Sequence, residues 1–221
     1  MTQTPQDTEL KTDRSRLRRA HEKGSYDRDS LYAVLDAMPM CHIGYQINGT
    51  PSVLPTLQWR EGDHVYWHGS SASRAIRAMD GADVCMTVTI LDGYVLSRSA
   101  FHHSVNHRSA MIFGRPEKVT DPTAKETHLK TMVDMIFPDR WDSLRPMTDQ
   151  ELKATALLRM PISEGAAKVR TGPPVDDDED YALPIWAGVV PMSLQLHHPE
   201  PDPANLQSVV MPDHLSRIRI G

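Results

Sequence analysis

The sequence has few cysteines and lacks the apolar segments that direct a chain into or across a membrane. Its 221 residues include two cysteines, Cys41 and Cys85, and each lies in an apolar run typical of a strand. A buried free thiol is commoner in such a run than a disulfide or a metal ligand. The N-terminus shows no signal-peptide pattern, and no apolar run is long enough to span a bilayer. We therefore expect a protein of the cytoplasm, where thiols stay reduced.

The sequence also lacks an excess of positive charge and the common signatures of catalysis. Its net charge of -5 at pH 7 gives no general attraction to nucleic acid or to an anionic membrane. It contains no P-loop, no G-x-G-x-x-G after the first strand, no H-E-x-x-H and no G-x-S-x-G. Neither nucleic acid nor a membrane is expected as a partner. No common catalytic motif indicates which reaction the protein would perform.

The eleven histidines raise the question of a metal or haem site, above all at His102, His103 and His107. His103 and His107 would meet on one face of a helix, but the serine, valine and asparagine around them are poor helix formers. We expect these rings to hydrogen-bond to a cofactor or to one another. A metal site is not expected, and haem ligation is disfavoured at these positions.

The stretch from Trp67 to Arg74 (W-H-G-S-S-A-S-R) joins a predicted strand to a predicted helix. Backbone N–H groups at a helix start are unpaired, the helix dipole favours negative charge there, and serine hydroxyls contact a phosphate or cap the helix. This combination is suited to an anion such as phosphate. The alternative is an ordinary serine-capped helix in which Arg74 and Arg77 face water.

A β-meander is predicted before this turn. Asn48-Gly49, a strong hairpin signal, connects a strand over residues 40–47 to a return strand over residues 50–59. The return strand contains Pro51 and Pro55, and proline cannot donate to a strand ladder. We expect this strand to be an edge or to be interrupted, with unpaired backbone groups at Pro55-Thr56-Leu57.

Two polar segments follow later in the chain. Residues 97–109 carry many polar groups and few apolar anchors between strands predicted at 84–91 and 110–115. Such a long polar loop between strong strands is typical of a functional site. The acidic run from Asp176 to Asp180 is expected to be a solvated loop, because consecutive carboxylates on a flexible loop do not converge on one metal ion.

The overall pattern contains six or seven strands, largely in hairpin order, and two or three helices, including those predicted at 29–38 and 121–138. This order favours an antiparallel barrel with helices packed outside over a parallel doubly wound sheet. We expect a flexible N-terminal leader over residues 1–15, one domain over residues 16–195, and a C-terminal tail over residues 196–221.

Three motifs, taken in order, resemble the pyridoxamine 5′-phosphate oxidase-like split-barrel family, in the flavin–nucleotide-binding branch that includes nitroimidazole-resistance proteins. They are Gly69-Ser70-Ser71-Ala72-Ser73-Arg74, the segment from Ser99 to Ser109, and the segment from Lys168 to Pro174 with Trp186-Ala187-Gly188. The resemblance covers residues 16–192. It implies an antiparallel split β-barrel with peripheral helices, FMN as cofactor, and a homodimer with its sites at the subunit interface.

The resemblance also implies roles for individual positions. Ser73 and Arg74 match the residues that hold the flavin phosphate, and the oxidases have a lysine where this chain has Ala75. Ser109 takes the place of a glutamine that contacts the flavin ring. The residues so implied to bind the cofactor are Val53, Leu54, Pro55, Thr56, Leu57, His68, Gly69, Ser70, Ser73, Arg74, Asn106, Arg108, Ser109, Lys168, Arg170 and Trp186.

Within this set, Lys168, Arg170 and Trp186 are expected to reach the flavin of the partner subunit. The resemblance implies an FMN-dependent oxidoreductase that acts on a small heterocyclic molecule through flavin N5, with the redox step performed by the cofactor. Two alternatives remain open, a flavin- or haem-binding protein without turnover and a reductase that uses F420 on the same fold. No catalytic side chain is predicted.

Overall fold

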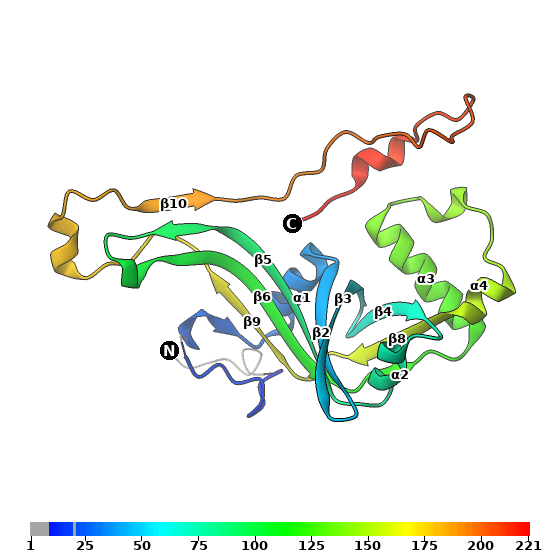
Figure 1. Cartoon of the computed structure of the whole chain (residues 1–221), viewed down its shortest axis with the longest axis horizontal. Coiled ribbons are helices and arrows are strands. Elements are labelled where there is room, and N and C mark those ends of the chain that lie inside the picture. Colours follow the sequence, from blue (N-terminus) through cyan, green and yellow to red (C-terminus); the bar gives the residue numbers. More distant parts are fainter. Residues whose placement is uncertain (1–8, 20) are drawn as a thin grey trace.

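The computed structural model describes residues 9–19 and 21–221, which form one curled antiparallel sheet of ten strands with helices around it (Figure 1). The strand order is β1-β9-β6-β5-β2-β3-β4-β8-β7, and β10 pairs with β5. Every pairing between described strands is antiparallel. The predicted antiparallel barrel with helices packed outside is confirmed.

The strands are β1 (Gly24–Ser25), β2 (Met40–Ile47), β3 (Thr50–Glu61), β4 (His64–Ser70), β5 (Val84–Leu96), β6 (Ser104–Gly114), β7 (Glu117–Lys118), β8 (Thr155–Pro161), β9 (Gly165–Arg170) and β10 (Gly188–Pro191). The α-helices are α1 (Arg28–Ala37), α2 (Arg74–Met79), α3 (Pro122–Ile136) and α4 (Asp149–Ala154). Short 3-10 turns are η2 (His21–Lys23), η3 (Ala100–His102), η4 (Trp141–Ser143), η5 (Asp178–Ala182) and η6 (Asp213–Arg217). None of the helices in the described part of the chain has the length and apolar character needed to cross a bilayer.

Strand β3 belongs to both halves of the sheet. Its residues 50–57 pair with β2, and its residues 58–61 pair with β4. The first half of β3 therefore has a neighbour on one side only, and this half contains Pro51 and Pro55. The edge predicted from these two prolines is confirmed, because neither has to donate to a second ladder.

Helix α1 is held to β3 at the point where that strand changes partner. The helix begins after Asp27, whose carboxylate accepts a hydrogen bond of 2.7 Å from the Ser30 backbone N–H. At its other end, Gln58 Nε2 donates to the carbonyl oxygens of Leu35 (2.8 Å) and Met38 (2.9 Å). These bonds satisfy carbonyls that every helix end leaves unpaired.

The apolar core lies in two clusters on opposite faces of the sheet at β4 and β8, whose successive residues point alternately to one cluster and the other. The larger cluster packs residues of β2, β4, β5, β6, β8 and β9 against α1 and α2, and it includes Ile43, Trp67, Met86 and Ile112. The smaller cluster consists of Trp59, Tyr66, Val119 and Leu157, against which Met132 of α3 packs. The two clusters fix α2 and α3 on opposite parts of the sheet.

The polar segment over residues 97–109 is shorter as a loop than the sequence predicts. Strand β6 begins at Ser104 and pairs with β5 as far as Val95, with one irregularity near Asp92-Gly93. Most of the segment is therefore the far end of a long β5–β6 hairpin, which projects from the molecule with β9 and β10 alongside it (Figure 1). Residues 104–109 pair in the β5–β6 ladder although few of them are apolar, so this part of the sequence resembles a loop.

The N-terminal leader differs from the prediction where the structure describes it. Leu10 is fully buried in the larger core cluster, and its backbone bonds to Tyr26 and Gly165. Residues 9–15 therefore pack on the domain, because one apolar side chain fills a site beside α1. The leader's residues 1–8 lie outside the described residues, and the limits of 16 and 195 for the domain stay predictions.

The acidic run also differs from the predicted solvated loop at its first residue. The Asp176 carboxylate is buried and accepts hydrogen bonds of 2.9 Å from both the backbone N–H and the guanidinium of Arg98. The guanidinium in turn lies over the Tyr181 ring. A buried carboxylate needs such a partner, and this one fixes the loop after β9 to the end of β5.

We expect the substitution Leu10→Ala to lower the free energy of unfolding by about 2–5 kcal/mol, the usual effect of removing a fully buried leucine side chain. Urea denaturation followed by circular dichroism measures this change. Leu206→Ala is the control, since Leu206 is 73% exposed. An equal and small effect of both substitutions would show that the leader does not contribute to the core.

Candidate functional site

The turn between β4 and α2 is built by its glycine and serines. A Cβ at Gly69 would lie 2.9 Å from Ile76 Cγ1, so only glycine lets α2 pack this closely against β4. Ser70 Oγ accepts from the Ala72 N–H at 3.2 Å, and Ser73 Oγ accepts from the Ile76 N–H at 3.4 Å as the N-cap. Gly69 and Ser70 therefore shape the turn, and Ser73 begins the helix.

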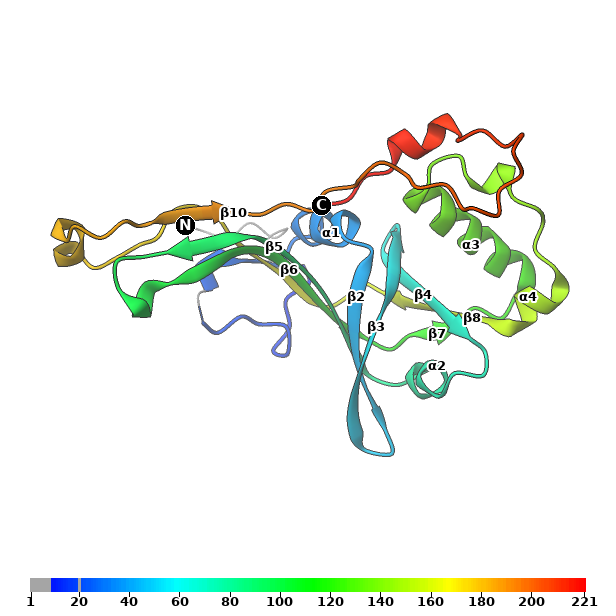
Figure 2. The same ribbon diagram turned by 45° about the horizontal axis from the view of Figure 1, so that its top comes forward.

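Ser73 and Arg74 face an open groove beside the β2–β3 hairpin. Their partners across the groove are Tyr45, Asn48, Thr50 and Ser52 at the hairpin end. Figure 2 shows this hairpin extending past α2. The hairpin turn is the one predicted, with Asn48 (φ 51°) and Gly49 (φ 78°) in the left-handed region.

These four hairpin residues are functional candidates that the sequence analysis missed. The hairpin signal at Asn48-Gly49 was present, but its proximity to Ser73 comes from packing between distant parts of the chain. Three of the four carry a hydroxyl group and the fourth an amide. Together with Ser73 they give the groove several neutral hydrogen-bonding groups around a single cation.

Arg74 is the charged group of this groove. Its side chain is exposed and makes no hydrogen bond or ion pair with another described residue. Helix α2 has six residues, so its dipole is small and the guanidinium supplies most of the positive potential. A free guanidinium beside a serine hydroxyl is well suited to a phosphate oxygen.

The predicted cofactor strand, residues 53–57 of β3, does not turn all its side chains to one side. Leu54 packs against the larger core cluster and Leu57 against the smaller one, whereas Val53 is 64% exposed. Thr56 is half-buried and Pro55 is exposed. What these residues share is the unpaired backbone edge of β3, which offers N–H and C=O groups to a ligand.

The outer face of the sheet brings several predicted residues together. Residues paired directly in an antiparallel ladder project to the same face. The register connects Pro55 through β2 and β5 to Met111 on β6, and Ser109, two residues before Met111, pairs with Lys168. Pro55, Ser109 and Lys168 therefore share the face that points away from the core.

The remaining predicted residues lie on the β5–β6 projection or beside it. Arg108 projects to the other face and forms an ion pair of 2.8 Å with Asp92. Arg170 donates to the Asn106 side chain, whose Nδ2 donates to the Gly172 carbonyl at 3.0 Å. Trp186, just before β10, is 68% exposed.

Within one chain, the predicted residues thus form two separate groups. Helix α2 and β4 lie on the other side of the β2–β3 hairpin from the tip of the β5–β6 projection (Figure 1). A single ligand bound at Ser73 and Arg74 of one chain is therefore out of reach of the residues at that tip. That the second group serves another subunit stays a prediction.

His68, another of the predicted residues, is half-buried beside an aromatic ring. Its ring lies 6.2 Å from the Trp59 ring between centroids, and its buried Nδ1 has no hydrogen-bond partner among the described residues. Burial lowers the pKa of the His68 imidazole below the ordinary value near 6.5. The ring is therefore neutral near pH 7.

The histidines of the polar segment bond to the protein rather than to one another. His103 Nδ1 lies 2.9 Å from the Ser99 carbonyl, and His102 Nε2 lies 3.3 Å from the Asp177 carboxylate. Across residues 9–19 and 21–221, no group of three or more His, Cys, Asp or Glu side chains is placed to hold a metal ion.

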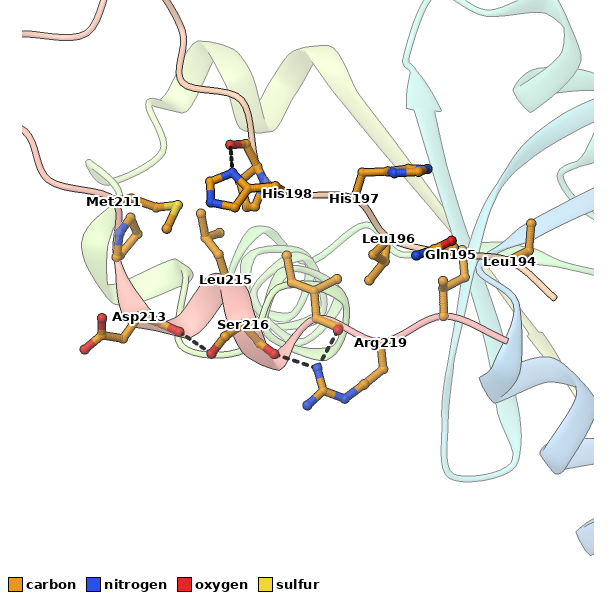
Figure 3. Close-up of a pocket in the computed structure, with 14 residues that line it drawn as sticks. Leu194, Gln195, Leu196, His197, His198, Met211, Asp213, Leu215, Ser216 and Arg219 are labelled. Atoms are coloured by element: carbon orange, nitrogen blue, oxygen red, sulfur yellow. Dashed lines mark hydrogen bonds between the residues drawn. The ribbon is translucent and has the colours of Figure 1, made fainter.

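A second cavity, of about 700 Å³, lies within the C-terminal tail (Figure 3). Residues 194–199 form one side and residues 211–220 the other. Its walls are mostly apolar, and its polar groups include His197, His198 and Arg219. No function was predicted for this tail, although its sequence contains two adjacent histidines close to two leucines.

Comparison with known proteins places this arrangement in a family. The sequence model for the pyridoxamine 5′-phosphate oxidase family matches residues 27–169. The chain belongs to this family. The resemblance drawn from the three sequence motifs is thereby confirmed, and the curled sheet is the split barrel of the pyridoxamine 5′-phosphate oxidases.

Two solved structures resemble the chain over nearly its whole length. A flavocytochrome, Anf3 from Azotobacter vinelandii, is 48% identical and covers 95% of this chain and 98% of its own, with a TM-score of 0.93. An FAD and haem binding protein from Mycobacterium smegmatis is 35% identical and covers 89% of this chain and 97% of its own, with a TM-score of 0.85. Both matches run well past residue 169, where the family match ends. No curated protein sequence matches the chain.

We expect the His68 ring to titrate below pH 6.5 in NMR spectra of the folded protein, with the resonance assigned by its loss in His68→Gln. Between the lowered folded pKa and the unfolded value near 6.5, the unfolded state binds more protons. The wild type should therefore lose stability relative to His68→Gln as the pH falls below 6.5. Parallel pH profiles for the two proteins would contradict this assignment.

Proposed function

We propose that this protein is a flavin- and haem-binding redox protein. The observation that carries the proposal is the similarity, at 48% identity over 95% of the chain, to a flavocytochrome. The M. smegmatis relative, named for FAD and haem binding, supports the same pair of cofactors. Its name is also the reason for proposing FAD in place of the FMN expected from the sequence. Neither relative is named for F420, and an F420 reductase is not proposed.

The flavin phosphate is proposed to bind in the groove between α2 and the β2–β3 hairpin. Arg74 is free to form a charge-assisted hydrogen bond there, and the Ser73 hydroxyl is adjacent to it. The unpaired edge of β3 is the proposed partner of the polar edge of the isoalloxazine ring. Ala75 supplies no second charge, so Arg74 carries the electrostatic part of binding.

The flavin, when bound, supplies hydride and single-electron transfer, and the haem supplies single-electron transfer. The residues of this chain hold and orient the cofactor: Arg74 and Ser73 its phosphate, and β3 its ring. An oxidoreductase acting on a small heterocyclic molecule is the proposed activity, and the cytoplasm is the proposed location. The proposed activity and the proposed location both rest on the sequence alone.

The proposed assembly is a homodimer that joins the two groups of site residues. The outer face of the sheet carries Met40, Val53 and Met111, which are 47%, 64% and 43% exposed. Large apolar side chains gathered on one face are typical of an interface. A second chain on this face would bring Lys168, Arg170 and Trp186 of one subunit toward the groove of the other.

We expect Arg74→Ala to weaken flavin binding by about 1.5–3 kcal/mol, the range for a hydrogen bond to a charged group. Titration of the flavin-free protein with FAD, followed by quenching of flavin fluorescence, measures the change. The same titration with FMN compares the two flavins through the phosphate they share.

Arg77→Ala is the matched control, because Arg77 lies on the same helix, is exposed and does not line the groove. It should leave flavin affinity unchanged. Equal affinities of wild type and Arg74→Ala would place the phosphate elsewhere, and a protein that binds no flavin at all would refute the proposed function.

A further inference from the structure

The C-terminal cavity is not used by the proposed flavin site and lies outside the residues that match the family. Six of its wall residues are Leu194, Leu196, Met211, Leu215, Ile218 and Ile220. An open, mostly apolar cavity of about 700 Å³ with a few polar groups has the size and lining typical of a small-molecule or cofactor site. The chemistry of those polar groups narrows the choice of ligand.

His198 has one ring nitrogen fixed and the other free. Its Nδ1 lies 2.9 Å from the Pro199 carbonyl oxygen, which only accepts, so the proton is on Nδ1. In the neutral ring Nε2 then carries a lone pair. An imidazole oriented by a hydrogen bond from its other nitrogen to a carbonyl is the common arrangement of a metal-bound histidine.

The neighbouring histidine is oriented differently. In Figure 3 the His198 ring extends toward Met211 and Leu215, whereas the His197 ring points the opposite way along the tail. Within the described chain, no hydrogen bond fixes the His197 ring. His198 is therefore the candidate ligand, and the adjacent His197 is its matched control.

An arginine at the same cavity supplies a positive charge. Arg219 donates through Nη1 to the carbonyl oxygens of Ser216 (2.6 Å) and Ile218 (2.8 Å), and Nη2 has no partner among the described residues. Arg217, two residues earlier, is engaged in an ion pair with Asp139 instead. Arg219 is thus held at the cavity with part of its guanidinium available to an anionic group.

We propose that this cavity is the haem pocket, with His198 Nε2 as the axial ligand to iron and Arg219 as the partner of a haem propionate. The inference rests on the proposed function for the presence of haem and adds where and by which residues it is held. The cavity fits haem because it offers the three features that haem binding needs: apolar walls, an imidazole ligand and a cation for the carboxylates.

The extent of the flavocytochrome match supports this location independently of the cavity. The family match ends at residue 169, whereas the flavocytochrome match covers 95% of the chain and so includes part of the tail. The part of the match beyond residue 169 therefore lies outside the region that the family model matches.

The test uses the full-length protein, freed of haem and titrated with haemin, with the Soret and visible bands as readout. The wild type should bind one haemin per chain with a histidine-ligated spectrum. His198→Ala should weaken haemin binding at least about tenfold and shift the Soret band, and added imidazole should restore the wild-type spectrum. His197→Ala should bind like the wild type.

Arg219→Gln should weaken haemin binding about ten- to a hundredfold while keeping the ligand-dependent bands, and Arg217→Gln should not change it. Flavin content, measured on the same samples, should be equal in all variants and so excludes misfolding. Unchanged haemin binding and spectrum in His198→Ala, with haem bound by the wild type, would overturn this inference alone. A wild type that binds flavin but no haemin would overturn the haem part of the proposed function as well.

Discussion

The change of partner within β3 is the constraint on which the rest of the structure depends. This strand leaves β2 and joins β4 between residues 57 and 58, and the Gln58 side chain ties that point to the end of α1. The change of partner leaves the first half of β3 with a free edge, while the two apolar clusters lie on opposite faces of β4 and β8. In the proposed flavin site, this free edge faces the flavin ring, and Ser73 and Arg74 lie beside the hairpin that contains it.

The same bend explains why the predicted cofactor residues lie apart within one chain. It places α2 and β4 on one side of the β2–β3 hairpin, while the β5–β6 hairpin, paired with β9 and β10, extends away on the other side (Figure 1). Residues chosen as one site by sequence similarity therefore lie in two groups. An exposed apolar face between them offers the surface on which a second subunit would reunite them.

Local chemistry made part of this arrangement predictable from the sequence. The Asn48-Gly49 turn and the serine-rich turn after β4 each depend on neighbouring residues. Contacts between distant residues were not predictable in the same way. The burial of Leu10, the Arg98–Asp176 ion pair and the extension of β6 back to Ser104 all arise from tertiary packing.

The residues of the candidate site also fall into those that local sequence predicts and those that only the fold brings together. Ser73 and Arg74 were accessible to sequence reasoning because one short turn contains them. The hairpin residues that face them, Tyr45 and Ser52 among them, are neighbours only in the folded chain. The tail cavity was missed for a related reason, since its two sides are separated by more than ten residues without regular structure.

The central claim is that each flavin site combines Arg74 of one subunit with Lys168 and Arg170 of the other. Mixed dimers of two variants, Arg74→Ala and Lys168→Ala/Arg170→Ala, test it directly through the amount of tightly bound flavin. In a shared site, the mixed dimer regains one intact site per two chains, although each parent dimer has none. Should the mixed dimer bind flavin no better than its parents, the site lies within one subunit and the account is wrong.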